Sequence, residues 1–188
     1  MVDAVLFKNA EAFEFWLEQH GKSKTEIWLK LAKTPAAEQS LNYAQALDVA
    51  LCHGWIDGVK KALDREHFLQ RFSPRKATSG WSKINCDKIE QLQKAGRMRE
   101  AGLAAVTQAK ASGTWDKAYA GSASIEVPED FAAALSGNAK AEAFFATLNR
   151  QNRYAFLYRV GTVKKAETRQ RKIAQYVEML AKGEKLHP

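Results

Sequence analysis

The chain has 188 residues, of which 46% are hydrophobic and 27% charged, a composition typical of one globular domain or one domain with a small appended module. Two cysteines are too few for a disulfide-rich scaffold, no stretch of about 18 apolar residues could span a membrane, and the N-terminus lacks a signal-peptide pattern, so we expect a cytoplasmic protein with two reduced thiols. The formal net charge is +8, and the positive charge is concentrated in one segment near the C-terminal end of the chain, residues 150–172.

The N-terminal part of the chain alternates between helical and extended patterns. Apolar residues are dense enough over 11–19 for a core-facing helix. Residues 25–34 alternate apolar and polar side chains, which predicts a half-buried strand closed by Pro35. Asn42 is expected to cap a helix that ends before Gly54.

Two extended runs follow at 55–63 and 67–72, and a short polar segment joins them. We interpret the two runs as an antiparallel hairpin. Because side chains alternate along a strand, Phe68 and Phe72 are expected on one face of the hairpin and Leu69 on the other.

Two helices and an irregular stretch come next. The first helix starts at Ser82 or Asn85 and stops at Gly96, and the second covers residues 100–112. Residues 113–126 are irregular and rich in glycine and serine, so we place a domain boundary there.

The remainder shows three helical patterns, of which the first begins at Pro128, the second breaks near Asn149 and the last covers 168–182. Together the elements predict an α+β fold, with a small antiparallel sheet flanked by helices and a helical C-terminal module after it. We expect an α+β domain over residues 1–120, which carries the hairpin and a candidate anion-binding loop. The helical module is expected over residues 126–186, packed on that domain.

The hairpin runs into RFSPRKATSGWSKIN at residues 71–85, a loop rich in hydrogen-bond donors. The helix that begins after it offers unpaired backbone N–H groups and a partial positive charge, which suit an anion. Arginine adds a planar fork for carboxylate or phosphate, and tryptophan walls would exclude water. The predicted ligand-binding residues are Trp55, Asp57, Arg71, Arg75, Lys76, Ser79, Trp81, Ser82 and Asn85.

In this hypothesis Arg75 and Lys76 neutralise the anion, while Ser82 and Asn85 orient it at the start of the helix. The other interpretation is purely structural. The serines then only cap the helix, the proline only ends the strand, and Trp81 belongs to the core. The sequence leaves both interpretations open.

Asp57 lies inside a predicted strand, where an acid is disfavoured unless it is exposed or paired. One explanation is an ion pair with Arg71 or Arg75 across the hairpin. The other makes Asp57 a ligand-binding residue or, if the protein is an enzyme, its general base. The enzyme interpretation requires Asp57 and Arg75 to face one cleft.

No familiar catalytic or metal-binding pattern accompanies these residues. The sequence has no G-x-S-x-G nucleophile motif, no phosphate-binding glycine loop, and no H-x-x-x-H or C-x-x-C metal spacing. The histidines lie in ordinary positions, with His53 before a capping glycine, His67 at a hairpin end and His187 in a tail that is expected to fray. We therefore predict a non-enzymatic protein without catalytic residues, bound metal or cofactor.

Between Arg150 and Lys172 eight basic residues accompany one acid, Glu167, which gives this segment a charge of +7. Basic helices attract nucleic acid or anionic lipid. Apolar residues recur among the cations at core-like spacing, so we favour a packed helical module with a solvated basic face. A nucleic-acid-binding protein that uses these C-terminal helices is the alternative.

Several motifs resemble the YdeI/OmpD-associated family, whose members are also called bacteriocin-protection proteins. In the C-terminal part the motifs are Val127-Pro128-Glu129-Asp130, Phe144-Phe145, Lys164-Lys165-Ala166-Glu167-Thr168-Arg169 and Arg171-Lys172-Ile173. In the N-terminal part they are Gly54-Trp55-Ile56-Asp57-Gly58, Phe72-Ser73-Pro74-Arg75-Lys76, Trp81-Ser82-Lys83-Ile84-Asn85 and Gly96-Arg97-Met98. The resemblance covers nearly the whole chain.

The resemblance implies a role in protection against antimicrobial peptides and an association with an outer-membrane porin, and it supplies no reaction and no catalytic residue. We therefore expect a stress- and bacteriocin-protection protein that binds an unknown protein partner or a small anionic ligand. The alternative from another class is an enzyme that acts on a small phosphorylated or carboxylated substrate, with Asp57 as its base.

Overall fold

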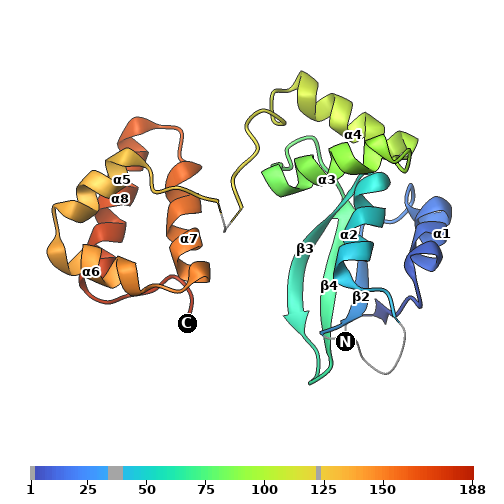
Figure 1. Cartoon of the computed structure of the whole chain (residues 1–188), viewed down its shortest axis with the longest axis horizontal. Coiled ribbons are helices and arrows are strands. Elements are labelled where there is room, and N and C mark those ends of the chain that lie inside the picture. The colour runs from blue at the N-terminus through green and yellow to red at the C-terminus, as the bar shows by residue number, and fades with distance from the viewer. Residues whose placement is uncertain (1–2, 34–39, 122–123) are drawn as a thin grey trace. The chain divides into compact units, whose positions relative to one another are not determined.

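The computed structural model describes residues 3–33, 40–121 and 124–188 (Figure 1). The chain divides into two compact units, Met1–Ala118 and Tyr119–Pro188, which we call the N-terminal unit and the C-terminal unit. The fold is α+β, as expected, since the N-terminal unit holds a sheet with helices and the C-terminal unit is helical. Pro35, the expected end of the second extended run, lies outside the described residues.

The sheet of the N-terminal unit has four strands in the order β1-β2-β4-β3: β1 (Ala4–Val5), β2 (Ile27–Ala32), β3 (Trp55–Ala62) and β4 (His67–Pro74). The predicted hairpin is confirmed, because β3 pairs antiparallel with β4, and β4 also pairs antiparallel with β2. The strand β1 was not expected and pairs parallel with β2, so the sheet is mixed rather than purely antiparallel. Two residues are too few to show an alternating pattern in a sequence.

The two faces of the hairpin are as predicted. Phe68 and Phe72 belong to the main hydrophobic core, whereas Leu69 points to the opposite face of the sheet. The pairing of β3 with β4 shifts between Asp57 and Lys60, which marks a β-bulge. Asp57 pairs with Phe72 and therefore shares the core side of the sheet.

Four helices complete the N-terminal unit: α1 (Ala10–His20), α2 (Tyr43–Cys52), α3 (Lys83–Lys94) and α4 (Glu100–Ala111). Local caps set where they begin. The Asn42 side chain accepts from the backbone N–H of Gln45, whose own side chain accepts from the backbone N–H of Asn42, so the capping box is complete. Ser82 caps α3 with a single bond, since its side chain accepts from the backbone N–H of Asn85. In Figure 1 the helix α2 lies against the sheet, and α3 and α4 lie at the end where β3 begins.

The helix α4 approaches the end of α2 very closely. Gly102 allows this, since a Cβ added there would lie 2.2 Å from the carbonyl oxygen of Cys52. The same carbonyl accepts a hydrogen bond from the backbone N–H of Arg99 at 3.0 Å. The absent side chain at Gly102 thus fixes where α4 stands.

The C-terminal unit consists of α5 (Glu129–Ser136), α6 (Ala139–Thr147), α7 (Arg150–Gly161) and α8 (Ala166–Ala181). The helices α5, α6 and α7 follow Pro128, Asn138 and Asn149 respectively, and both asparagine side chains accept a backbone N–H of the first turn. Their buried residues form a second core, made of Phe131, Leu135, Ala141, Phe145, Leu148, Phe156, Leu157, Val160, Ile173, Tyr176 and Leu180. None of the helices in the described residues is long and apolar enough to cross a membrane.

The end of the chain is fastened to this second core, contrary to the expected frayed tail at His187. The Asn152 side chain is buried, and its Oδ1 accepts from the backbone N–H of Leu186 at 3.1 Å and of His187 at 2.9 Å. Its Nδ2 donates to the His187 carbonyl at 3.2 Å. A buried amide with both ends satisfied holds a segment that has little apolar surface of its own.

Candidate functional site

The loop between β4 and α3 is organised around one stacked pair. The guanidinium carbon of Arg75 lies 3.5 Å from the centre of the Trp81 ring, and Arg75 Nη2 donates to the Gly80 carbonyl at 2.9 Å. The backbone N–H of Arg75 also donates to the Gly54 carbonyl at 2.9 Å. A cation on an indole face is an attractive contact, and these bonds hold the Arg75 side chain in one orientation.

The inner side of this loop is closed. Trp81 is buried and packs against Trp115 with ring centres 4.9 Å apart. The space left between Arg75, Trp81 and the facing residues of α4 measures about 10 Å³, which is room for one water molecule at most. A ligand therefore cannot enter between the loop and α4.

A groove opens on another side of Arg75, within the N-terminal unit. It has a volume of about 730 Å³ and is lined by Gly21, His53, Gly54, Trp55, Pro74, Arg75 and, from α4, Ala101, Ala104, Ala105, Thr107, Gln108 and Ala111. Two predicted site residues, Trp55 and Arg75, meet there, although only Arg75 belongs to the loop. Four alanines on one helix keep the groove open, because their side chains fill little of it.

Asp57 does not take part in this groove. Its Oδ2 accepts a hydrogen bond from the Tyr43 hydroxyl at 2.8 Å, so its partner is α2 rather than either arginine of the hairpin. The groove lined by Arg75 does not include Asp57. The condition for Asp57 as a general base, that it face one cleft with Arg75, therefore finds no support in this groove.

Arg71 lies on the face of the sheet opposite to Asp57, as its neighbour Phe72 pairs with Asp57. Its Nη1 donates to Glu26 Oε2 at 3.3 Å. The guanidinium also passes over Gly58, where an added Cβ would lie 3.2 Å from Arg71 Nε. An expected ion pair between Arg71 and Asp57 is therefore wrong, and the space above Gly58 is taken by a side chain of the protein itself.

The polar residues of the loop have structural partners. Ser79 Oγ accepts the backbone N–H of Lys76 at 3.0 Å, and the Lys76 side chain is exposed. Ser82 Oγ accepts the backbone N–H of Asn85 at 3.2 Å and thereby caps α3. These contacts agree with the structural interpretation of both serines.

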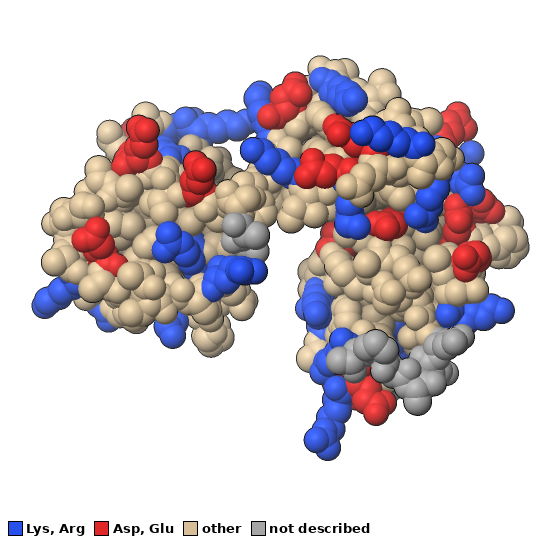
Figure 2. Space-filling view, viewed as in Figure 1, with Lys and Arg blue, Asp and Glu red and all other residues tan. Residues whose placement is uncertain are grey.

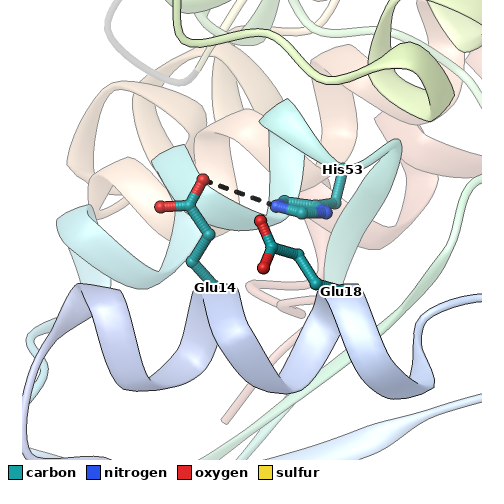
Figure 3. A group of neighbouring side chains, drawn as sticks. All are labelled: Glu14, Glu18 and His53. Atoms are coloured by element: carbon teal, nitrogen blue, oxygen red, sulfur yellow. Dashed lines mark ion pairs between the residues drawn. The ribbon is translucent and has the colours of Figure 1, made fainter.

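A second group of polar side chains lies beside the groove and was not found from the sequence. Glu14 and Glu18 project from α1, and His53, which also lines the groove, follows the end of α2 (Figure 3). One ligand atom from each of the three lies within 4.8 Å of the others. Burial lowers the pKa of His53, and the neighbouring Glu14 opposes that shift only in part.

Arg99 partly neutralises these carboxylates. Its Nη2 lies 2.7 Å from Glu14 Oε1 and 3.8 Å from Glu18 Oε1. The only signal of this group in the sequence is the spacing of Glu14 and Glu18, which places two like charges four residues apart on one helical face. The other members come from distant elements.

The two cysteines supply no nucleophile. Cys52 and Cys86 are both buried and free. Burial raises the pKa of each thiol, and the thiolate is the reactive form. Both behave as small apolar residues of the core.

The basic segment of the C-terminal unit is a packed pair of helices with a charged exterior, as the sequence favoured. Phe156, Leu157, Val160, Ile173 and Tyr176 are buried in the second core. Three of its eight cations contact groups of the same unit, since Arg153 lies over the Phe145 ring, Lys172 over the Tyr176 ring, and Arg169 pairs with Asp130. The exposed cations are Arg150, Arg159, Lys164, Lys165 and Arg171.

The N-terminal unit has a more even surface. On the face shown in Figure 2, acidic and basic side chains intermix over α3 and α4. Such a mixture creates no strong field of one sign. An anion would therefore be attracted by Arg75 in the groove rather than by the whole face of this unit.

Two motifs of the C-terminal part meet in one ion pair. Arg169 Nε lies 2.5 Å from Asp130 Oδ2 and Nη2 lies 2.9 Å from Oδ1, while Nη1 donates to the Val160 carbonyl at 2.6 Å. The Asp130 Oδ1 also accepts the backbone N–H of Phe131 at 2.9 Å. One guanidinium thus joins the start of α5, the end of α7 and the start of α8. Its role is structural.

The Asp130–Arg169 pair predicts an acid dependence of the C-terminal unit. The hydrogen bonds from Arg169 lower the pKa of Asp130 from its usual value. A carboxyl group with a lowered folded pKa stabilises the fold above its unfolded pKa, and the contribution is lost as the pH falls through the folded pKa. Because the Asp130 side chain is 47% exposed, we expect Asp130→Asn to cost only about 1 kcal/mol at neutral pH.

Urea unfolding followed by far-ultraviolet circular dichroism between pH 7 and pH 2 tests this. The gap between the original protein and Asp130→Asn should close as the pH falls through the lowered pKa of Asp130, where the folded carboxyl group protonates. Glu178→Gln serves as the control, since Glu178 pairs with the exposed Lys182 one turn away on the same helix. A gap that is unchanged at pH 2 would contradict the assignment.

Two family models match the chain. One, described as a domain of unknown function (DUF8412), matches residues 5–105, which is more than half of the chain. The other, described as Bacteriocin-protection, YdeI or OmpD-Associated (OmdA), matches residues 124–183. The resemblance inferred from the C-terminal motifs is thus confirmed, while the N-terminal motifs fall within the region of the other model. Neither the curated proteins nor the solved structures gave a match.

Proposed function

The chain belongs to the family of the domain of unknown function DUF8412 and carries a C-terminal OmdA domain, and from this we propose that it acts in bacteriocin protection by binding a small anionic ligand in the groove beside Arg75. The name of the OmdA family supports the first part of the proposal. The groove supports the second, because about 730 Å³ lies in the usual range of small-molecule sites.

The position of Arg75 is the observation that supports an anionic ligand, because its guanidinium would pair with the negative charge. It lines the groove, and its stacking on Trp81 and its hydrogen bond to the Gly80 carbonyl orient the guanidinium. A fixed guanidinium loses little conformational entropy when a carboxylate or phosphate binds it.

The rest of the groove suits a ligand with an apolar part. Trp55 and the alanines of α4 give apolar walls, and Gln108 and Thr107 add uncharged hydrogen-bonding groups. This combination of apolar walls with a few polar groups is typical of ligand sites. Small carboxylates and phosphates with an apolar portion are therefore the class that fits best.

Arg75→Gln is expected to weaken the binding of inorganic phosphate or a short-chain carboxylate by about tenfold, since a charge-assisted hydrogen bond is replaced by a neutral one. Nuclear magnetic resonance can measure this through the indole N–H of Trp55, which lines the groove. Arg71→Gln is the matched control, because Arg71 belongs to the same hairpin but pairs with Glu26 outside the groove. Equal losses in both variants would contradict the site.

A cellular experiment tests the protective role separately. Bacteria that express the chain should survive a bacteriocin challenge better than cells that lack it, and Arg75→Gln should reduce survival more than Arg71→Gln. If cells with Arg75→Gln were protected as well as cells with the original chain, the groove would not be needed for protection. Survival that is unaffected by the chain itself would overturn the role, whatever the groove binds.

A further inference from the structure

We propose that Glu14, Glu18 and His53 form a binding site for a divalent transition-metal ion, with Zn²⁺ as the best fit. The proposal is independent of the anionic ligand. It rests on the geometry of the three side chains, on the burial of the histidine and on the charge of the group.

The geometry of the group suits one ion. Glu14 and Glu18 are one helical turn apart on α1, so both carboxylates project to the same side, and His53 faces them from the end of α2 (Figure 3). His53 Nε2 lies 3.6 Å from Glu14 Oε1. Two ligands of a tetrahedral Zn²⁺ ion, with bonds of about 2.0–2.2 Å, stand roughly 3.3–3.6 Å apart. The His53–Glu14 pair is already near the spacing that an ion would impose, and all three ligand atoms lie within 4.8 Å of one another.

The histidine points to a missing partner. Its side chain is only 10% exposed, and its Nε2 has no hydrogen-bond partner among the described residues. The 3.6 Å to Glu14 is too long for a hydrogen bond. A buried ring nitrogen without a partner is costly, and a metal ion between Nε2 and the carboxylates would satisfy it.

The charge of the group also favours a cation. Two carboxylates face one guanidinium, that of Arg99, so one negative charge is left over when His53 is neutral. Arg99 pairs with a carboxylate that an ion would bind, since its Nη2 is 2.7 Å from Glu14 Oε1. Its side chain is 49% exposed and can turn into solvent. Arg99 is therefore a competitor of the ion and not a fourth ligand.

The donor set selects the kind of metal. One imidazole nitrogen and two carboxylate oxygens suit Zn²⁺ and similar ions, whereas Ca²⁺ and Mg²⁺ prefer oxygen ligands alone. Three protein ligands leave one position of a four-coordinate ion for water or an anion. The site is thus expected to prefer Zn²⁺ to Mg²⁺ and Ca²⁺.

The test uses the full chain, freed of metal with a chelator, and titrates it with ZnCl₂ in a calorimeter. We expect one site per chain. Glu18→Gln and His53→Gln should each weaken Zn²⁺ binding by at least about tenfold, because each removes a ligand. Arg99→Gln should tighten it, because the competing cation is gone. The control is His20→Gln, as the His20 ring contacts the Trp16 ring and His20 is not one of the three proposed ligands.

A direct readout comes from the imidazole nitrogens of His53, whose nuclear magnetic resonance signals should shift on adding Zn²⁺ while those of His67 do not. Circular dichroism checks that His53→Gln is folded. If that variant is unfolded, Glu18→Gln still tests the site, because the Glu18 side chain is 45% exposed and its replacement should leave the fold intact. Equal Zn²⁺ affinity in the original chain and Glu18→Gln would overturn the proposal. So would binding that is seen only after Arg99 is replaced.

Discussion

Gly102→Ala is expected to lower the free energy of unfolding of the N-terminal unit by about 3 kcal/mol, the upper end of the usual cost of overpacking. The added Cβ would lie 2.2 Å from the carbonyl oxygen of Cys52 and 2.8 Å from Met98 Cε. The methionine can move, but the carbonyl belongs to the backbone at the end of α2. The helix α4 must therefore shift away from α2.

The shift has a consequence for the groove, because α4 supplies one of its walls through Ala101, Ala104 and Gln108. Gly102→Ala should therefore weaken anion binding as well as stability. Urea unfolding followed by tryptophan fluorescence measures the stability of this unit alone, since all five tryptophans of the chain precede residue 118.

The matched control is Gly161→Ala at the end of α7, where an added Cβ meets no atom within 4 Å. Alanine there should leave the stability of the protein unchanged or raise it by up to about 1 kcal/mol, as alanine is the better helix former. If Gly102→Ala unfolded within 1 kcal/mol of the original protein, the close contact between α4 and α2 would not be the constraint we describe.

Asn152→Ala is expected to destabilise the C-terminal unit by about 2–4 kcal/mol. The buried amide makes three hydrogen bonds to the backbone of Leu186 and His187. Alanine would leave those groups without partners or release the tail into water. Release would also uncover Leu186, which packs against the second core.

Two measurements check this expectation. Circular dichroism in urea reports the lost stability, and limited digestion with trypsin should cut at Lys182 and Lys185 sooner in Asn152→Ala if the tail is released. Gln175→Ala is the control, because it removes an exposed amide on α8 and should change stability by less than about 0.5 kcal/mol. Equal digestion rates in the two variants would contradict the role of Asn152.

The element types were predictable because their signals are local. The capping box at Asn42 and the cap at Ser82 each join residues within three positions of one another, and Pro128 directly precedes α5. The strand β1 escaped prediction because its two residues owe their extended form to pairing with β2, which lies more than 20 residues away. The frayed tail was wrong for a similar reason, since its partner Asn152 is 35 residues from His187.

The nine predicted ligand-binding residues show that closeness in the sequence does not place side chains in one site. Asp57 and Arg71 were grouped because both belong to the hairpin, but the register of β3 against β4 puts them on opposite faces of the sheet. Conversely, the alanines of α4 that line the groove showed no functional signal. An alanine contributes to a groove only when other elements face it across the open space, and the sequence does not show which elements do so.

The sequence by itself determined the helices, the hairpin, the α+β class and the C-terminal family motifs, because these depend on periodicity and on residues a few positions apart. Only the tertiary structure decided which partner each polar side chain has. It gave Arg75 the face of Trp81, Asp57 the hydroxyl of Tyr43, and His53 the carboxylates of α1. The physical reason is that such contacts depend on the packing of distant elements, which local preferences do not specify.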